Sequence, residues 1–74
     1  MINRDDVRKV LSDTVFGFDL ETIEDDQEFI EVGIDSLDHI NFLLGVEEFS
    51  GVEIPDDMVE YCSSINNILK YVNK

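Results

Sequence analysis

One residue of the chain is well placed to do chemistry: Ser36, in the stretch GIDSLD at residues 33–38. The residues around it predict the first turn of a helix, where free backbone N–H groups and the positive end of the helix dipole favour an anion. A phosphate ester on the Ser36 hydroxyl would be stabilised there. The same residues also make an ordinary helix start with Asp35 as the N-cap. The motif therefore predicts either a phosphate-linked group on Ser36 or only a helix start.

The charge of the chain is strongly negative and unevenly distributed. The formal net charge is −13 over 74 residues, and the five cations all lie near the ends, at Arg4, Arg8, Lys9, Lys70 and Lys74. Such a surface repels nucleic acid and anionic lipid and attracts partners with basic patches. Because 43% of the residues are hydrophobic, the chain is too apolar for a disordered acidic tail. We expect a single domain over residues 1–74, monomeric and cytoplasmic, with no nucleic-acid or membrane partner.

Two helices are predicted in the first half of the chain. Asn3 is a suitable N-cap for a helix that ends near Phe16 and Gly17. A second helix is expected from Ser36 to about Phe49, with Asp35 as its N-cap. The connection over residues 18–34 is long for so small a domain. We expect its apolar residues to pin it to the core: Phe18, Leu20, Ile23, Phe29, Ile30 and Val32.

The second half predicts two more helices. Pro55, followed by two acids, is typical of a helix start, and this short third helix should end near Cys62. Ser63 or Ser64 is expected to cap a fourth helix with apolar residues at helical spacing. No useful strand alternation is present. The predicted fold is all-α, a small four-helix bundle with a long first loop and a short third helix.

The second predicted helix has two apolar faces. At about 100° per residue, one face carries Phe42, Leu43, Val46 and Phe49. The other carries Leu37, Ile40 and Leu44 among the polar residues Asn41, Glu47 and Glu48. A small domain can fully bury only one face of a helix. We expect the aromatic face to be core and the other to be a docking surface, with burial of Leu37 and Leu44 as the alternative.

The stretch GIDSLDHI, followed by an acidic amphipathic helix and then EIPD, closely resembles the acyl carrier protein family across nearly the whole chain. The resemblance implies that Ser36 carries 4′-phosphopantetheine through a phosphodiester, with Asp35, Leu37 and Asp38 around the attachment point. A phosphopantetheinyl transferase would attach this group, whose thiol would hold an acyl group as a thioester. The chain departs from the family pattern at Asn41, where an acid is usual, and at Gly45, where alanine is common.

The resemblance also implies roles for the two faces of the second helix. The outward face would contact acyl-loading, ketosynthase or acyltransferase-type enzymes through basic patches on those partners. Its residues would be Leu37, Asp38, Asn41, Leu44, Gly45 and Glu48. The inward residues Phe42, Leu43, Val46 and Phe49 would line an interior that opens around an apolar chain.

Several alternatives remain open at this stage. Asp35 and Asp38 favour a fatty acid or polyketide type of carrier over an aminoacyl or peptidyl one, and the length favours a free-standing protein. A non-carrier acidic interaction module is the alternative from another class. The acids lack the spacing of a calcium loop, so we expect no dedicated metal site, with weak binding of divalent cations to crowded acids as the alternative.

We also expect no catalytic residues. His39, the single histidine, is expected to be solvated at the surface, and nothing in the sequence forms a nucleophile–base pair with Ser36. Cys62, the single cysteine, is expected to be a buried small apolar group.

Overall fold

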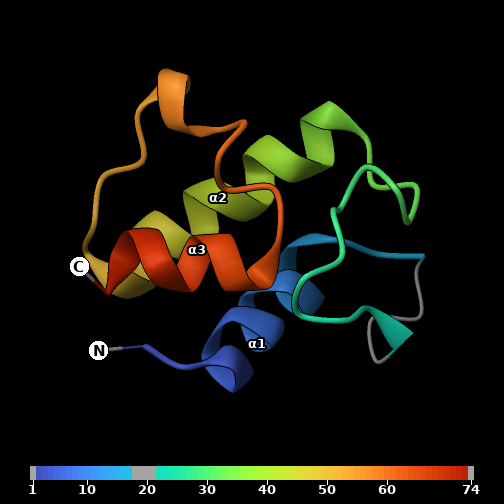
Figure 1. The fold of residues 1–74 in the computed structure, drawn as a ribbon, viewed down its shortest axis with the longest axis horizontal. Helices are drawn as coiled ribbons and strands as arrows, with labels where there is room; N and C mark the ends of the chain where they lie inside the picture. The colour runs from blue at the N-terminus through green and yellow to red at the C-terminus, as the bar shows by residue number, and fades with distance from the viewer. Residues whose placement is uncertain (1, 18–21, 74) are drawn as a thin grey trace.

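The computed structural model describes residues 2–17 and 22–73, and three α-helices form its framework (Figure 1). They are α1 (Arg4–Thr14), α2 (Ser36–Ser50) and α3 (Ile65–Val72). Helix α1 contacts both α2 and α3. No strand is present within the described residues, so the all-α prediction is confirmed. The expected anchors Phe18 and Leu20 lie outside the described residues.

The helices begin where short polar side chains can cap them. The Asn3 Oδ1 atom accepts from the backbone N–H of Asp6 at 2.9 Å, and the Asp6 carboxylate accepts from the backbone N–H of Asn3 at 3.1 Å. Asp35 caps α2, and Ser64 rather than Ser63 caps α3, each accepting from the N–H three residues further on. These bonds satisfy N–H groups that have no partner inside a helix. The predicted helix starts of α1 and α2 are therefore confirmed.

Helix ends differ slightly from the predictions. Helix α1 ends at Thr14, before the predicted Phe16 and Gly17, because Val15 is already extended with φ −121°. Helix α2 ends at Ser50, where Gly51 takes the left-handed conformation with φ 73°. Glycine adopts this conformation without steric cost, so Gly51 terminates the helix.

The expected short third helix is present only as a single 3-10 turn, η2 (Asp56–Met58). Its bonds span three residues, from the N–H of Met58 to the Pro55 carbonyl and from Val59 to Asp56. Only one such turn fits between Pro55 and the residues that lead into the core at buried Cys62. The described residues thus contain three α-helices and η2 rather than four α-helices.

The core draws on all three α-helices and on both long connections. Phe42, Leu43 and Val46 are buried as predicted, whereas Phe49 is 50% exposed. The expected burial of Phe49 is wrong because the buried face of α2 is centred between Phe42 and Leu43. On that axis the next residue is Ser50, which is half-buried and donates to the Val46 carbonyl at 2.7 Å.

Buried apolar side chains hold the connection over residues 22–35 to the core. Ile23, Phe29 and Ile34 are buried and Val32 is partly buried, but Ile30 is 77% exposed. Ile30 therefore does not anchor the connection as expected. Residues 29–33 form turns, and a turn that directs Phe29 inward leaves its neighbour facing solvent.

The first and last described residues, Ile2 and Asn73, lie next to each other on one side of the molecule (Figure 1). The Ile2 N–H donates to the Asn73 side-chain oxygen at 3.1 Å, and the Asn73 amide donates back to the Ile2 carbonyl at 2.8 Å.

None of the helices in the described part of the chain is long and apolar enough to cross a membrane.

Candidate functional site at the first turn of α2

Ser36 is the first residue of α2 and is exposed. The Asp35 carboxylate accepts from the Asp38 N–H at 2.8 Å, and the Asp35 carbonyl accepts from the His39 N–H at 3.0 Å. The N–H groups of Ser36 and Leu37 point out of the end of the helix, as the first N–H groups of a helix do. The Ser36 hydroxyl therefore lies in solvent beside a partial positive charge.

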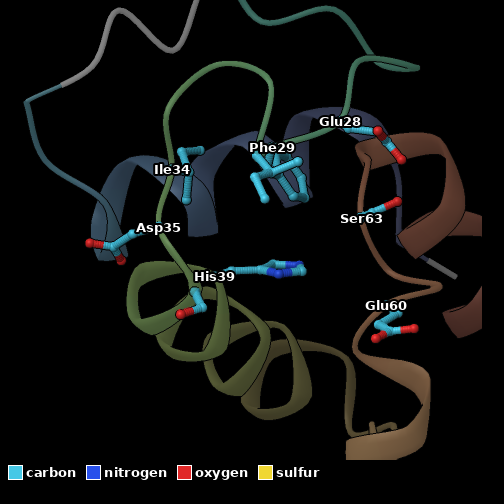
Figure 2. Close-up of a pocket in the computed structure, with 9 residues that line it drawn as sticks. Glu28, Phe29, Ile34, Asp35, His39, Glu60 and Ser63 are labelled. Carbon is cyan, nitrogen blue, oxygen red and sulfur yellow. The ribbon is translucent and has the colours of Figure 1, made fainter.

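A hollow of about 260 Å³ opens beside Ser36. Three parts of the chain form its walls: the end of the first connection, the first turn of α2 and the segment that precedes α3 (Figure 2). Its floor is apolar, with Phe29 and Ile34, and carboxylates stand at its rim. The lining residues are Glu28, Phe29, Ile30, Ile34, Asp35, Ser36, His39, Glu60 and Ser63.

His39 projects from α2 across this hollow toward the segment before α3 (Figure 2). Its Nε2 atom lies 2.8 Å from the Cys62 carbonyl oxygen, and because a carbonyl can only accept, Nε2 carries the proton and donates. The imidazole also contacts the Phe29 ring, with centroids 5.6 Å apart. The expectation of a solvated His39 is thus wrong. The sequence signal was its spacing, three residues before Phe42 and four before Leu43, which places it on the buried face.

Cys62 is fully buried, as predicted. Burial raises the pKa of its thiol because the thiolate is poorly solvated in the apolar interior. A protonated, inaccessible thiol is a poor nucleophile. Cys62 therefore serves packing and presents its carbonyl to His39.

The residues at the first turn of α2 fit a covalently held phosphate ester better than a bound anion. The hydroxyl of Ser36 is accessible and the helix terminus stabilises negative charge. Against this, the carboxylates of Glu28, Asp35 and Glu60 line the same hollow, and like charges repel a free anion. A phosphodiester bond to Ser36 does not depend on ionic affinity, so the site suits a phosphate-linked group that is attached rather than bound.

The outward face of α2 exposes apolar side chains next to Ser36. Leu37 is 67% and Leu44 is 51% exposed, so the alternative that these leucines are core is wrong. Asn41 and Glu48 are exposed on the same helix, and Asp38 is partly exposed. A second hollow, of about 450 Å³, lies between α2 and η2 and includes Ile40, Leu44 and Val59 in its lining. Sequence reasoning assigned no role to this second hollow.

Gly45 lies between α1 and α2, although the sequence placed it on the outward face. A Cβ atom at this position would be 2.9 Å from the Val10 Cγ1 atom and 3.2 Å from the Thr14 Cγ2 atom. Both distances are shorter than ordinary van der Waals contact. Glycine therefore allows the two helices to approach each other closely here.

No group of three or more His, Cys, Asp or Glu side chains in the described ranges is arranged to hold a metal ion. Asp25 instead pairs with the cations Arg4 and Arg8.

Comparison with known proteins agrees with the geometry at Ser36. Residues 5–72 match the family described as "Phosphopantetheine attachment site". The chain is 35% identical over 69 residues to the acyl carrier protein of Sinorhizobium fredii (strain NBRC 101917 / NGR234), covering 92% of this chain and 87% of that protein. The acyl carrier protein AcpP of Rhizobium meliloti (strain 1021) matches with the same identity and the same coverage. The chain thus belongs to the acyl carrier protein family, in which the prosthetic group is 4′-phosphopantetheine.

Proposed function

We propose that this protein holds an acyl group as a thioester on 4′-phosphopantetheine attached to Ser36, and that it carries this cargo without catalysing a reaction on it. The prosthetic group supplies a thiol at the end of a flexible arm. The observation that carries the proposal is the exposed Ser36 hydroxyl at the start of α2, within the region that matches the attachment-site family.

Each residue around Ser36 has a separate role in this proposal. Asp35 caps the N-terminus of α2, and this cap holds the Ser36 hydroxyl at the surface. Leu37 and Asp38 flank the attachment point and offer an apolar and an acidic contact to the enzyme that modifies Ser36. The inward residues Phe42, Leu43 and Val46, all buried, form the apolar interior behind the site; exposed Phe49 is not among them.

The outward face of α2 supports a role in partner binding. Leu37, Leu44 and Glu48 present apolar and acidic groups on one side of the helix, and the net charge is −13. A phosphopantetheinyl transferase and acyl-loading or acyl-transferring enzymes with basic patches fit this surface. Such charge complementarity chiefly raises the association rate, which suits brief encounters with several partners.

An acyl cargo is preferred over an aminoacyl or peptidyl one. Both relatives are named as acyl carrier proteins, and Asp35 and Asp38 flank Ser36 as in the fatty acid and polyketide type of carrier. We place this protein in a fatty acid or polyketide type of pathway on that basis.

The test is intact mass after incubation with coenzyme A and a phosphopantetheinyl transferase. In the reaction the Ser36 oxygen displaces adenosine 3′,5′-bisphosphate from coenzyme A, and the hydroxyl proton is released. Wild type should gain the mass of one phosphopantetheine group, and Ser36→Ala should gain none while retaining its helical circular dichroism. Ser63→Ala, a serine in the wall of the same hollow, is the matched control and should be modified like wild type. An unmodified wild type would refute the proposal.

A further inference from the structure

His39 stands between the attachment serine and the apolar interior. Ser36 and His39 line the same hollow. The imidazole contacts the Phe29 ring, which also lines the hollow, and the Phe29 ring in turn packs edge-on against Phe42, with centroids 5.2 Å apart. Ser36, His39 and Phe29 thus face the hollow, and buried Phe42 lies behind the Phe29 ring.

The imidazole also closes the boundary between α2 and the segment that precedes α3. Its Nε2–H donates to the Cys62 carbonyl at 2.8 Å, and the next carbonyl, that of Ser63, accepts from the Phe29 N–H at 2.9 Å. Two adjacent carbonyls thus receive one bond from α2 and one from the first connection. Of the two, only the bond from His39 is made by a side chain, and a side-chain rotation can break it without unfolding any backbone.

We infer that His39 is a latch that sets which acyl chains this carrier shelters; the inference rests on the proposed attachment at Ser36. A chain held at Ser36 passes from this hollow between α2 and the segment before α3, toward Phe42, only after the imidazole leaves the Cys62 carbonyl. Short chains fit in the hollow with the latch closed. Longer apolar chains must break the hydrogen bond before they are buried, so their thioesters stay more exposed than those of a carrier with a small side chain at this position. His39 is thereby a specificity-determining residue for the cargo.

The experiment compares thioester exposure for chains of different length. Wild type, His39→Ala and His39→Gln are loaded at Ser36 from butanoyl- and dodecanoyl-coenzyme A with a phosphopantetheinyl transferase, and loading is verified by intact mass. Cleavage of each thioester by hydroxylamine is then followed by mass. Glutamine retains an N–H donor of similar reach, so His39→Gln is the matched control.

For the dodecanoyl thioester we expect cleavage of His39→Ala to be about fivefold slower than that of wild type, the factor that corresponds to one net hydrogen bond. The butanoyl thioesters should be cleaved at equal rates, and His39→Gln should resemble wild type. Equal dodecanoyl rates in wild type and His39→Ala would overturn the latch alone. Failure of wild type to load at Ser36 would overturn the proposed function and the latch with it.

A second measurement covers the case in which His39→Ala does not fold. In wild type, nuclear magnetic resonance of the imidazole nitrogens should show a proton fixed on Nε2 in the unloaded and butanoyl forms. The dodecanoyl form should lose that fixed proton, because the latch opens. An Nε2 proton that is retained to the same degree in all three forms contradicts the inference.

Discussion

The two long connections of this protein bound the same hollow but are held in different ways. The first connection, described over residues 22–35, is fixed by an ionic cluster. The Asp25 carboxylate lies 3.1 Å from the Arg4 Nε atom and accepts from the Arg8 guanidinium at 2.9 Å. The Asp25 carbonyl also accepts from the Asn66 N–H at 2.8 Å. One residue thus joins α1, the connection and the first turn of α3.

The second connection, over residues 51–64, is held by separate single hydrogen bonds. The Ile54 N–H donates to the Glu47 carboxylate at 3.1 Å, the Tyr71 hydroxyl donates to the Glu53 carbonyl at 3.1 Å, and His39 donates to the Cys62 carbonyl at 2.8 Å. Each of these three bonds uses a side chain that a rotation can release; the backbone bond from the Phe29 N–H to the Ser63 carbonyl links this connection to the first one. The comparison indicates that the hollow beside Ser36 has one fixed wall, built from the first connection, and one releasable wall, built from the second.

The largest expected effect is a loss of folding stability when a residue of the fixed wall is replaced. Phe29→Ala should lower the free energy of unfolding by about 3–5 kcal/mol, because it removes a buried ring that contacts both His39 and Phe42. Urea unfolding followed by circular dichroism measures this loss. The neighbouring substitution Ile30→Ala removes an exposed side chain and should change stability by less than about 0.5 kcal/mol. Similar losses for both variants would contradict the inward and outward placement of these two residues.

Asp25→Ala tests the ionic cluster of the fixed wall. We expect a loss of about 1–2 kcal/mol, since the carboxylate is partly buried and pairs with two cations. Thermal and urea unfolding should show the loss shrinking as salt is added. Asp26→Ala, at the exposed adjacent acid, is the control and should be nearly neutral. A neutral Asp25→Ala would mean that the first connection is no better fixed than the second.

Gly45→Ala tests how tightly α1 and α2 pack behind both connections. Alanine in place of a helical glycine ordinarily stabilises by about 0.5–1 kcal/mol, but here its Cβ would meet Val10 at 2.9 Å. We therefore expect a net destabilisation of about 1 kcal/mol in urea unfolding. The double variant Val10→Ala/Gly45→Ala should lose less than the sum of the two single losses, because the contact is shared. Stabilisation by Gly45→Ala alone would show that the two helices separate readily.

The smallest expected effect is a change in the pH dependence of stability when Cys62, in the releasable wall, is replaced. Its folded pKa is raised by burial, whereas the pKa of an unfolded cysteine is about 8.5. The folded state then binds the thiol proton more strongly than the unfolded state does. The stability that this difference in proton binding adds is complete below the unfolded pKa and is lost as the pH rises above it. Unfolding free energies of wild type and Cys62→Ala, measured from neutral to alkaline pH, should converge above about pH 8.5. A difference that stays constant with pH would contradict the raised pKa.

Sequence reasoning located the capped starts of the helices correctly, including the helix start that carries Ser36. Asn3 and Asp35 each cap through a hydrogen bond to a residue three positions along, so the relevant partners were visible in the local sequence. Ser64 was one of two equivalent candidates, and it is the cap because α3 begins at Ile65, which places the Asn67 N–H within reach of the Ser64 hydroxyl. The short third helix was overestimated because a proline followed by acids predicts a start but not a length.

Sequence reasoning and structure differed most over which side of α2 packs into the core. The wrong expectations for Phe49 and His39 have one cause: at about 100° per residue, the centre of the buried residues Phe42, Leu43 and Val46 lies nearer to His39 than to Phe49. Hydrophobicity alone favoured a phenylalanine over a histidine. The structure instead offers the His39 imidazole a carbonyl and an aromatic ring, which compensate for burying a polar group.

The sequence by itself determined the family of this protein, the position of Ser36 at a helix start, the acidic surface and most of the apolar core. These properties depend on residue types and on contacts a few positions apart. Only the tertiary structure decided that His39 bridges to the Cys62 carbonyl, that Gly45 lets α1 approach α2, and that the two connections differ in how they are held. Each of these depends on how helices are rotated and spaced against segments far away in the chain, which local patterns do not specify.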